Sequence, residues 1–224
     1  MESENSKIKA LKEQLNLELQ KEISDNNLIL SLSNEITSLD NENVRFSIDA
    51  GVIDRLGKEL VARQETAVSE LVKNSYDADS TEVKLTFVES ENSGGTLKIE
   101  DNGDGMTRDE LVNGFMRISS TDKIHNPKSR IFKRKRAGQK GIGRFAVQRL
   151  GRKLTIITQT ANSQFALKLT VDWNKYVKDV DLLSISNTIT TIEKTKEKGT
   201  DLIISELRDK WSVASIKRIY RYVS

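Results

Sequence analysis

The first 43 residues alternate apolar and polar positions with the period of an amphipathic helix. Apolar side chains recur every three or four residues, with lysines and glutamates between them, at Ile8, Leu11, Leu15, Leu19 and Ile23. Three leucines at alternate positions then break this period, at Leu28, Leu30 and Leu32. The pattern predicts a helix, an interruption and a second short helix. We expect residues 1–43 either to pack on their own domain or on a partner, or to form a coiled-coil linker or dimerisation arm.

From residue 44 to about residue 208 the pattern changes to shorter segments of mixed type. The stretch "VRFSI" (44–48) predicts a short strand, and residues 51–62 and 65–79 predict two helices. Residues 82–88 and 96–101 alternate as strands do, and "ENSGG" between them indicates a hairpin.

The middle of the chain combines one helix start with a long irregular stretch. Thr107 and Glu110 have the spacing of a capping box, so a helix should begin there. Residues 116–141 show little periodicity and contain the only proline, Pro127. A loop of that length inside a compact domain is usually functional or disordered. "GRFAVQRLG" predicts a helix that ends at Gly151.

Four further strands are predicted at residues 153–159, 164–171, 185–192 and 200–205. The elements together predict an α/β (α+β) two-layer sandwich, a mixed and largely antiparallel sheet with helices on one face. We expect residues 1–43 to form a helical extension, residues 44–208 the main domain, and residues 209–224 the start of a following, truncated domain.

Composition narrows the functional class. The 36 basic and 33 acidic residues nearly balance, so overall charge gives no argument for a nucleic-acid partner. The absence of cysteine and the single histidine exclude disulfides, thiolate chemistry and histidine-rich metal sites. No apolar run reaches the roughly 18–20 residues that span a bilayer, and the N-terminus lacks a signal-peptide core. We expect a cytoplasmic protein with no membrane partner.

Three polar residues share one face of the predicted helix 65–79. Glu70, Asn74 and Asp77 are separated by four and three residues, which makes them neighbours on a helix. An asparagine oxygen suits a Mg²⁺ ion that takes most other ligands from water and phosphates. A glutamate one turn away could orient or deprotonate an attacking water. Alone, the same spacing also fits an ordinary exposed helix face.

A second cluster, "EDNGDGM", follows the predicted strand 96–101. Asp101 ends the strand, and Gly103, Gly105 and Met106 come after it. Two glycines at this spacing permit positive φ and close approach of the backbone to a ligand. A partly buried carboxylate needs a donor, for which an exocyclic amine is suitable. The alternative is a simple turn, because Asn-Gly and Asp-Gly are common turn dipeptides.

A third cluster, "AGQKGIGRFAVQRLG", is a glycine-rich loop that opens a helix. It offers free backbone amides and one lysine to an anion, at Gly138, Lys140, Gly141 and Gly143. "GIGRFA" has the spacing of a dinucleotide fingerprint, but no strand precedes it and no acidic residue follows until Asp172, so that interpretation is rejected. The Walker A pattern is absent. A fourth cluster is Gly199 and Thr200, which lead into a strand.

These four clusters, in this order, resemble the boxes of the GHKL ATPase superfamily, which includes DNA gyrase B, the ninety-kilodalton heat-shock chaperone, sensor histidine kinases and MutL. The resemblance covers roughly residues 46–208. "ELVKNSYDA" resembles the N box, "DNGDGM" the D-x-G-x-G box, "GQKGIG" the G-x-x-G-x-G box and "GTDLI" the late Gly-Thr strand. The resemblance implies a Bergerat fold that binds Mg-ATP.

The resemblance also implies a role for each matching residue. Glu70 would be the general base and Asn74 the magnesium ligand. Asp101 would accept a hydrogen bond from the adenine amine, with Thr200 joined to it through a water. The base pocket would be lined by Gly103, Gly105 and Met106, and the phosphates wrapped by Gly138, Lys140, Gly141, Ile142 and Gly143. Asp77 would brace the helix against a nearby basic residue.

Residues 114–137 would then be the ATP lid. Its "SSTDK" segment is similar to the lid of the chaperone and MutL branches. The helical arm contains no histidine, and His125 falls in the lid, so a phosphoacceptor histidine would have to lie outside this chain. A run of basic residues in the lid could be solvated, contact phosphates or contact nucleic acid, and comprises Lys128, Arg130, Lys133, Arg134, Lys135 and Arg136.

The function expected from the resemblance is Mg-ATP binding with slow hydrolysis, which drives lid closure or dimerisation in a chaperone-like or MutL/MORC-like multidomain ATPase. Related proteins place a lysine from a second domain on the γ-phosphate, and without it this chain should turn over slowly. The alternatives are the catalytic domain of a sensor histidine kinase and a non-enzymatic, nucleotide-gated interaction module. Expected partners are ATP or ADP, a second copy, and a protein client or downstream domains; nucleic acid has weaker support.

Overall fold

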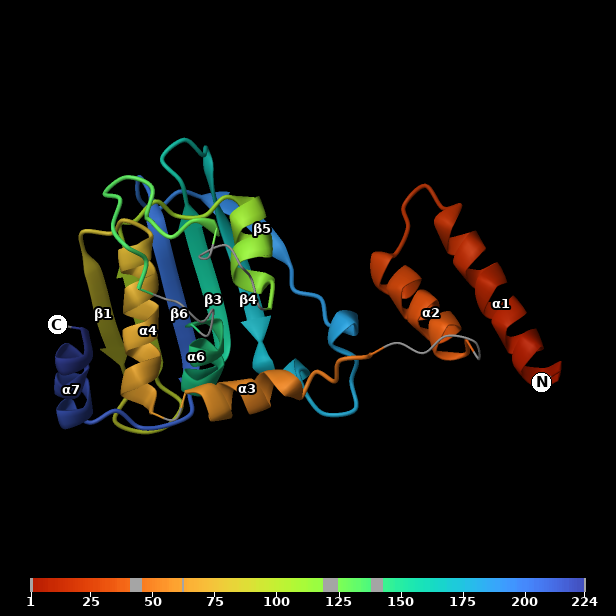
Figure 1. Ribbon diagram of the computed structural model, residues 1–224, viewed down its shortest axis with the longest axis horizontal. Helices are drawn as coiled ribbons and strands as arrows, with labels where there is room; N and C mark the ends of the chain where they lie inside the picture. Colours follow the sequence, from red (N-terminus) through yellow and green to blue (C-terminus); the bar gives the residue numbers. More distant parts are fainter. Residues whose placement is uncertain (1, 41–45, 62, 119–124, 138–142, 224) are drawn as a thin grey trace. The chain divides into compact units, whose positions relative to one another are not determined.

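The chain divides into two structural units. The computed structural model describes residues 2–40, 46–61, 63–118, 125–137 and 143–223 (Figure 1). One unit comprises Met1–Val52 with Val177–Ser186, and the other comprises Ile53–Tyr176 with Asn187–Ser224. Each unit is described separately below. No described helix is long and apolar enough to cross a membrane.

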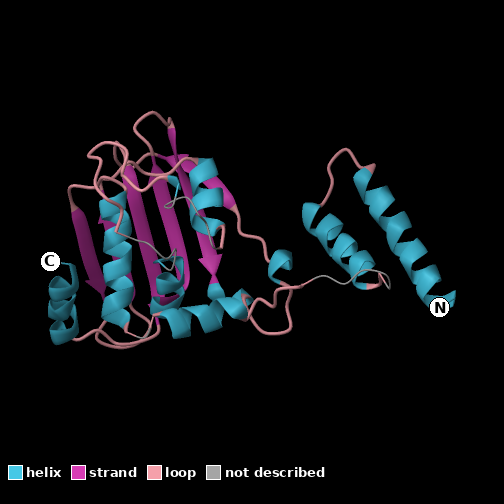
Figure 2. Cartoon of the chain, in the orientation of Figure 1, coloured by secondary structure: helices cyan, strands magenta, loops and turns pink. Residues whose placement is uncertain are grey.

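The larger unit is built on a six-stranded sheet (Figure 2). Its strands are β1 (Val83–Val88), β2 (Thr96–Asp101), β3 (Gly151–Gln159), β4 (Phe165–Asp172), β5 (Ile189–Glu193) and β6 (Gly199–Leu207). They lie in the order β1-β2-β6-β3-β4-β5, and every adjacent pair of these strands is antiparallel. The predicted two-layer, largely antiparallel fold is confirmed. β6 comes last in the sequence yet lies between β2 and β3, which brings the late Gly-Thr strand beside Asp101.

The two faces of the sheet differ because side chains alternate along each strand. One face is apolar and fully buried, with Leu97, Ile99, Leu154, Ile156 and Ile204 each no more than 1% exposed. The helices α4 (Gln64–Asp77) and α6 (Gly143–Leu150) pack on each other and on this face (Figure 1). The opposite, open face carries exposed lysines at Lys84, Lys98 and Lys168. Because of this alternation, α4 and its polar row lie on the apolar side of the sheet.

Two further helical segments of this unit are α3 and a π-helix. The helix α3 (Val52–Leu60) precedes α4, as the predicted helices 51–62 and 65–79 require. The capping box is confirmed, because the Thr107 amide donates to Glu110 Oε2 over 2.8 Å and the Glu110 amide donates to Thr107 Oγ1 over 3.3 Å. The helix that follows is a π-helix, Glu110–Met116. Such segments are rare and occur often at functional sites.

The strand predicted at 44–48 is wrong for the part that the structure describes. Residues 46–48 are not in a strand, and only Asp49 forms an isolated bridge, to Asp181. The Asp49 carboxylate instead accepts hydrogen bonds from the amides of Gly51, over 2.8 Å, and Asp179, over 2.6 Å. A short polar side chain that binds nearby backbone in this way competes with strand pairing.

The strand predicted at 185–192 is shorter in the structure, because residues 185–188 form no helix or strand. The 3₁₀ helices η2 (Trp173–Lys175) and η3 (Leu182–Ser184) occupy the connection, and β5 begins only at Ile189. Asp172 and Asp181 cap these turns, accepting from the amides of Asn174 and Leu183. Aspartate caps give a local alternative to the sheet that apolar alternation does not reveal.

The smaller unit contains the predicted helix, interruption and second helix. These are α1 (Glu2–Leu19) and α2 (Asn26–Ser38), which pack on each other with Leu11 and Leu32 buried. Asp25 caps α2 by accepting from the amides of Asn27 and Leu28. Whether this extension dimerises stays a prediction.

The last helix, α7 (Val213–Val223), packs against α4 in the larger unit. Ile219 is 2% exposed, and the Ser69 hydroxyl of α4 donates to the Tyr222 carbonyl over 3.1 Å. Just before α7, Trp211 is 1% exposed and its ring lies 5.0 Å from that of Phe87 on β1. Residues 209–224, expected to begin a following domain, thus anchor to the sheet through Trp211 and to α4 through α7.

Replacing Trp211 with alanine should therefore destabilise the larger unit by about 3–5 kcal/mol, because it empties a fully buried aromatic site. Val213, which is 67% exposed, gives the control, since Val213→Ala removes no buried contact. Urea denaturation of both variants measures the difference. Equal midpoints for the two variants would contradict the packing described here.

Candidate functional site

The polar row predicted on one helix lies along α4. Glu70 is ion-paired with Lys73 over 2.8 Å, and 24% of the Glu70 side chain is exposed to solvent. Asn74 follows one turn later and is half-buried. Asp77 is 5% exposed and accepts a hydrogen bond from the Ala137 amide over 2.7 Å. Glu70 therefore remains accessible to solvent, whereas Asp77 holds a neighbouring segment of the chain.

The centre of the site is the Asp101 carboxylate at the end of β2. It is buried, with 8% of the residue exposed, and accepts hydrogen bonds from three described residues. Ser75 of α4 donates its hydroxyl to Oδ2 over 2.9 Å, and the amides of Gly103 and Thr200 donate to Oδ1 over 3.0 and 3.1 Å. A carboxylate has about four acceptor positions. These donors leave capacity for one further hydrogen bond, such as one from a ligand amine.

The surroundings of Asp101 also shift its titration. Burial raises the pKa of the Asp101 carboxyl above its usual range. The Gly103 amide, the Ser75 hydroxyl, the Thr200 amide and the charge of Lys196 oppose this shift without cancelling it. Because burial still outweighs these donors, a further hydrogen bond donated by a ligand would stabilise the charged carboxylate. The site is therefore suited to a ligand that brings a donor.

The two glycines of the second cluster are required by the backbone of the protein itself. Gly105 has φ +69°, and a Cβ atom there would lie 2.1 Å from the Gln159 carbonyl oxygen. A Cβ atom at Gly103 would lie 2.7 Å from the Ala78 carbonyl oxygen. The loop from Asp101 to Met106 thus fits tightly between the end of α4 and the end of β3. The glycines were expected to let the backbone approach a ligand closely. In the structure they let it approach the neighbouring backbone of Ala78 and Gln159.

Two threonines connect this loop to the central strands. The Met106 amide donates to Thr158 Oγ1 of β3 over 2.8 Å, and the Thr158 and Thr200 hydroxyls lie 3.0 Å apart. Thr200 reaches Asp101 through its amide rather than its hydroxyl. Gly199 has φ +123°, and a Cβ atom there would lie 2.1 Å from the Asp101 carbonyl oxygen. β2, β3 and β6 are therefore joined at one point beside Asp101.

Ser75 and Thr158 are site residues that the sequence patterns alone did not identify. Thr158 follows Leu154 and Ile156 at alternate positions of β3, so a polar side chain at an inward position was the available signal. Ser75 lies next to Asn74 and faces β2, which only the packing of α4 on the sheet makes evident.

The phosphate end of the predicted site is described in part. Gly138, Lys140, Gly141 and Ile142 lie outside the described residues, and Gly143 begins α6. α6 packs on α4, the helix that carries Glu70 and Asn74. Helix N-termini favour anions through free amides and the helix dipole.

The second half of the predicted lid is a short hairpin that docks on the end of α4. Asp79, at φ +59°, accepts from the amides of Ile131 and Phe132 over 2.5 and 3.2 Å. The Arg134 guanidinium lies 4.7 Å from the centre of the Tyr76 ring and 4.5 Å from that of Phe132. Burial disfavours the charged Asp79 carboxylate, but its donors and Arg134 outweigh burial and lower its pKa.

Most of the basic run projects from this hairpin into solvent. Lys128, Lys133 and Lys135 are exposed, Arg130 pairs with Glu110, and Arg134 is held by the rings described above. The three interpretations of the run, as solvated, phosphate-contacting or nucleic-acid-contacting residues, stay predictions.

The described donor set fits a magnesium ion that arrives with the phosphates of a nucleotide. Among the described residues no group of three or more acidic or histidine side chains could hold a metal by itself. Mg²⁺ in nucleotide sites commonly takes one or two protein oxygens and the rest from phosphates and water. A single amide oxygen at Asn74 is compatible with that arrangement.

Comparison with known proteins agrees with this geometry. A family model described as "Histidine kinase-, DNA gyrase B-, and HSP90-like ATPase" matches residues 62–202, more than half of the 224-residue chain. The chain is 30% identical over 122 residues to the DNA mismatch repair protein MutL of Lactobacillus helveticus (strain DPC 4571), covering 54% of this chain and 17% of that protein.

Other MutL proteins give similar matches. That of Streptococcus uberis (strain ATCC BAA-854 / 0140J) is 33% identical over 107 residues, 48% of this chain and 16% of the relative. That of Bacillus mycoides (strain KBAB4) is 29% identical over 150 residues, 66% of this chain and 20% of the relative. The matched region therefore spans a fifth or less of the length of these relatives.

The raised pKa of Asp101 predicts a pH-dependent stability difference between the protein and its Asp101→Asn variant. A pKa raised in the folded state gives stability that is fully present below the unfolded value, about 3.9, and is lost as pH rises through the folded pKa. Relative to the variant, the wild-type protein should therefore lose unfolding free energy as pH rises above about 4 and through the raised pKa of Asp101. Urea denaturation at a series of pH values measures this. A difference that does not change with pH would contradict it.

Proposed function

Because the chain belongs to the family of histidine kinase-, DNA gyrase B- and HSP90-like ATPases, we propose that the site around Asp101 and α4 binds Mg-ATP and hydrolyses it slowly. The observation that carries the proposal is the buried Asp101 carboxylate, which has donors on three sides and capacity for one more. It lies beside the helix that carries Glu70 and Asn74.

Adenine recognition is assigned to the loop after β2. The Asp101 carboxylate accepts from the adenine amine, while Ser75 and the Thr200 amide keep its oxygens oriented. Gly103, Gly105 and Met106 line the base. A buried acceptor without its donor is unfavourable, so such a site discriminates strongly against a base that lacks the amine.

Hydrolysis is assigned to α4. Asn74 binds the magnesium ion that accompanies the nucleotide, and the ion supplies charge neutralisation at the phosphates. Glu70 lies one turn earlier and remains solvent-accessible, which suits a residue that orients and deprotonates water. Its ion pair with Lys73 limits the positions that the carboxylate can adopt. The loop ending at Gly143 and the α6 N-terminus bind the phosphates, with Lys140 and the amides of Gly138, Gly141 and Ile142.

The larger biological role is proposed from the relatives. MutL proteins are named for DNA mismatch repair, and this chain matches a fifth or less of their length. We propose that nucleotide binding closes the lid and promotes association with a second copy or with downstream domains, which act on a protein or nucleic-acid client. Phosphotransfer to a histidine is disfavoured because a solvent-accessible glutamate one turn before Asn74 suits attack by water.

Isothermal titration with a non-hydrolysable ATP analogue, with and without magnesium, tests the binding proposal. We expect magnesium-dependent, stoichiometric binding. A folded chain that binds no adenine nucleotide under either condition would overturn the proposal.

Replacing Glu70 with glutamine should reduce phosphate release by about 100-fold or more, because a positioned base contributes roughly 10²–10⁴ to such reactions. ATP affinity should change little, since the glutamine keeps the size of the side chain. Single-turnover release of labelled phosphate measures the rate.

The matched control is Glu91→Gln, which makes the same chemical change in the exposed turn between β1 and β2. Its rate should equal that of the wild-type protein. Hydrolysis by Glu70→Gln at the wild-type rate would remove Glu70 from the mechanism while leaving nucleotide binding to be judged separately.

A further inference from the structure

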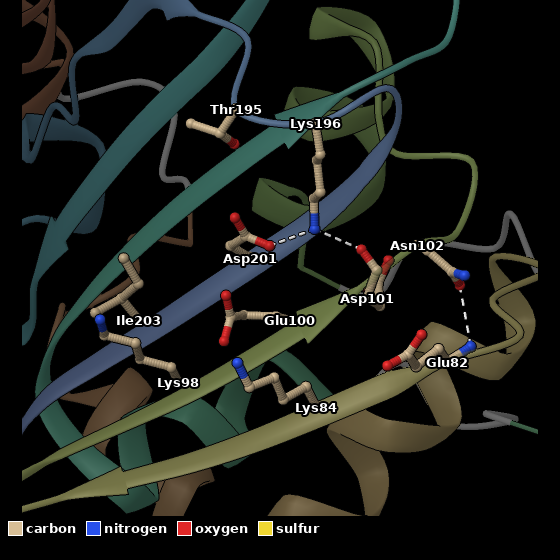
Figure 3. A pocket seen from close by; sticks show the side chains of 10 residues that line it. All are labelled: Glu82, Lys84, Lys98, Glu100, Asp101, Asn102, Thr195, Lys196, Asp201 and Ile203. Atoms are coloured by element: carbon tan, nitrogen blue, oxygen red, sulfur yellow. Dashed lines mark hydrogen bonds and ion pairs between the residues drawn. The ribbon is translucent and has the colours of Figure 1, made fainter.

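A shallow cavity of about 470 Å³ lies on the open face of the sheet, behind the Asp101 main chain (Figure 3). Its floor is made of charged side chains from β1, β2 and β6, namely Lys84, Lys98, Glu100 and Asp201. Lys196, from the loop between β5 and β6, closes one end. This cavity is separate from the helix-covered face toward which the Asp101 side chain points.

Lys196 connects the cavity to the proposed adenine site. Its Nζ donates to the Asp101 carbonyl oxygen over 2.5 Å and forms an ion pair with the Asp201 carboxylate. Figure 3 shows the ammonium group between these two residues. The Lys196 side chain is 27% exposed, so the pair is partly shielded from solvent. The lysine therefore binds the back of the residue whose carboxylate faces the site.

The sheet register places two carboxylates side by side next to Lys196. Glu100 of β2 is paired with Asp201 of β6, and this is the last pair between the two strands. Like charges at directly paired positions destabilise a sheet. Lys84 of β1 lies directly opposite Glu100, and Lys196 forms the ion pair with Asp201. Asp101 lies one residue past this pair, just before the backbone turns away through the glycines. Its main chain is paired with Val83 on the β1 side and is contacted by Lys196 on the β6 side.

The residues before and after Lys196 in the chain are held in place by hydrogen bonds and an ion pair. The Thr195 amide donates to Gln159 Oε1 over 3.1 Å, and Gln159 Nε2 donates back to the Thr195 hydroxyl over 3.2 Å. Lys198 forms an ion pair with Asp104 over 3.0 Å. Lys194 donates to the Thr160 carbonyl over 3.0 Å. Residues 194–198 thus form a strap anchored to the end of β3 and to the loop that follows Asp101.

We propose that Lys196 is a positioning residue for base recognition, which acts through the Asp101 main chain and sets the affinity for the 6-amino group of the nucleotide. The inference rests on the proposed function, that adenine binds at Asp101. With Lys196 in place, the end of β2 is held so that the Asp101 carboxylate meets both its internal donors and the base. Without it, the end of β2 shifts, so that the carboxylate and the donors around it no longer meet the base in the same position.

The test compares two triphosphates that differ only in the amine. Binding of a non-hydrolysable ATP analogue and of the matching purine riboside triphosphate, which lacks the 6-amino group, is measured for the wild-type protein and for Lys196→Met. The variant should bind the ATP analogue about tenfold more weakly, the lower end of the effect of removing a supporting partner at a binding site. Its affinity for the purine analogue should match that of the wild-type protein.

Three further variants separate positioning from general stability. Lys196→Arg keeps the charge and donor and should restore most of the preference for the amine. Lys196→Gln removes the charge, keeps a donor and should give an intermediate preference; it also replaces Lys196→Met should that variant not fold. Lys194→Met removes the neighbouring strap lysine, which does not contact Asp101, and should leave the preference unchanged.

Two outcomes would overturn the inference about Lys196, and a third would overturn the proposed function on which it rests. Wild-type preference for the amine in the folded Lys196→Met or Lys196→Gln protein would show that Lys196 does not position Asp101. Equal weakening for both triphosphates would show a general structural role. A wild-type protein that binds neither triphosphate would overturn the proposed function itself.

Discussion

The structure depends on one constraint, the burial of the Asp101 carboxylate at the meeting point of β2, β6 and α4. Its oxygens are satisfied by Ser75 from the helix, Gly103 from the following loop and the Thr200 amide from the neighbouring strand. Each donor comes from a different element. Burial penalises the charge and these donors compensate it. The carboxylate therefore ties the helix layer to the sheet where the proposed nucleotide would bind.

The strand order makes this convergence possible. Because β6 lies between β2 and β3, residues nearly one hundred positions apart in sequence become neighbours at Asp101 and Thr200. The Thr158 hydroxyl then joins the Met106 amide to Thr200 across β3. On the same side of the molecule, the end of α4 holds the lid hairpin through Asp77 and Asp79. One helix thus connects the proposed base site, the hydrolytic residues and the lid.

The sequence was informative where the signal is local. The polar row of α4, the capping box at Thr107 and the glycines after β2 follow from spacing and backbone geometry, and the sheet follows from alternation. Lys196 could not be predicted, because its role depends on a contact with Asp101 that only the placement of β6 creates. The strand predicted at 44–48 was wrong because Asp49 binds nearby amides instead. The lid hairpin, without periodicity, is held by tertiary contacts from Asp79.

The most direct test of this account is an amide NMR titration of the labelled chain with a non-hydrolysable ATP analogue and magnesium. The account predicts saturable shifts at the amides of Gly103 and Thr200, which donate to the Asp101 carboxylate, and at those of Gly105 and Met106 in the loop that follows it. Little change is expected at Lys168 and Thr170 on the open face of β4. Saturable shifts confined to the open face, or none in a folded chain, would contradict the claim that Asp101 is the centre of a nucleotide site.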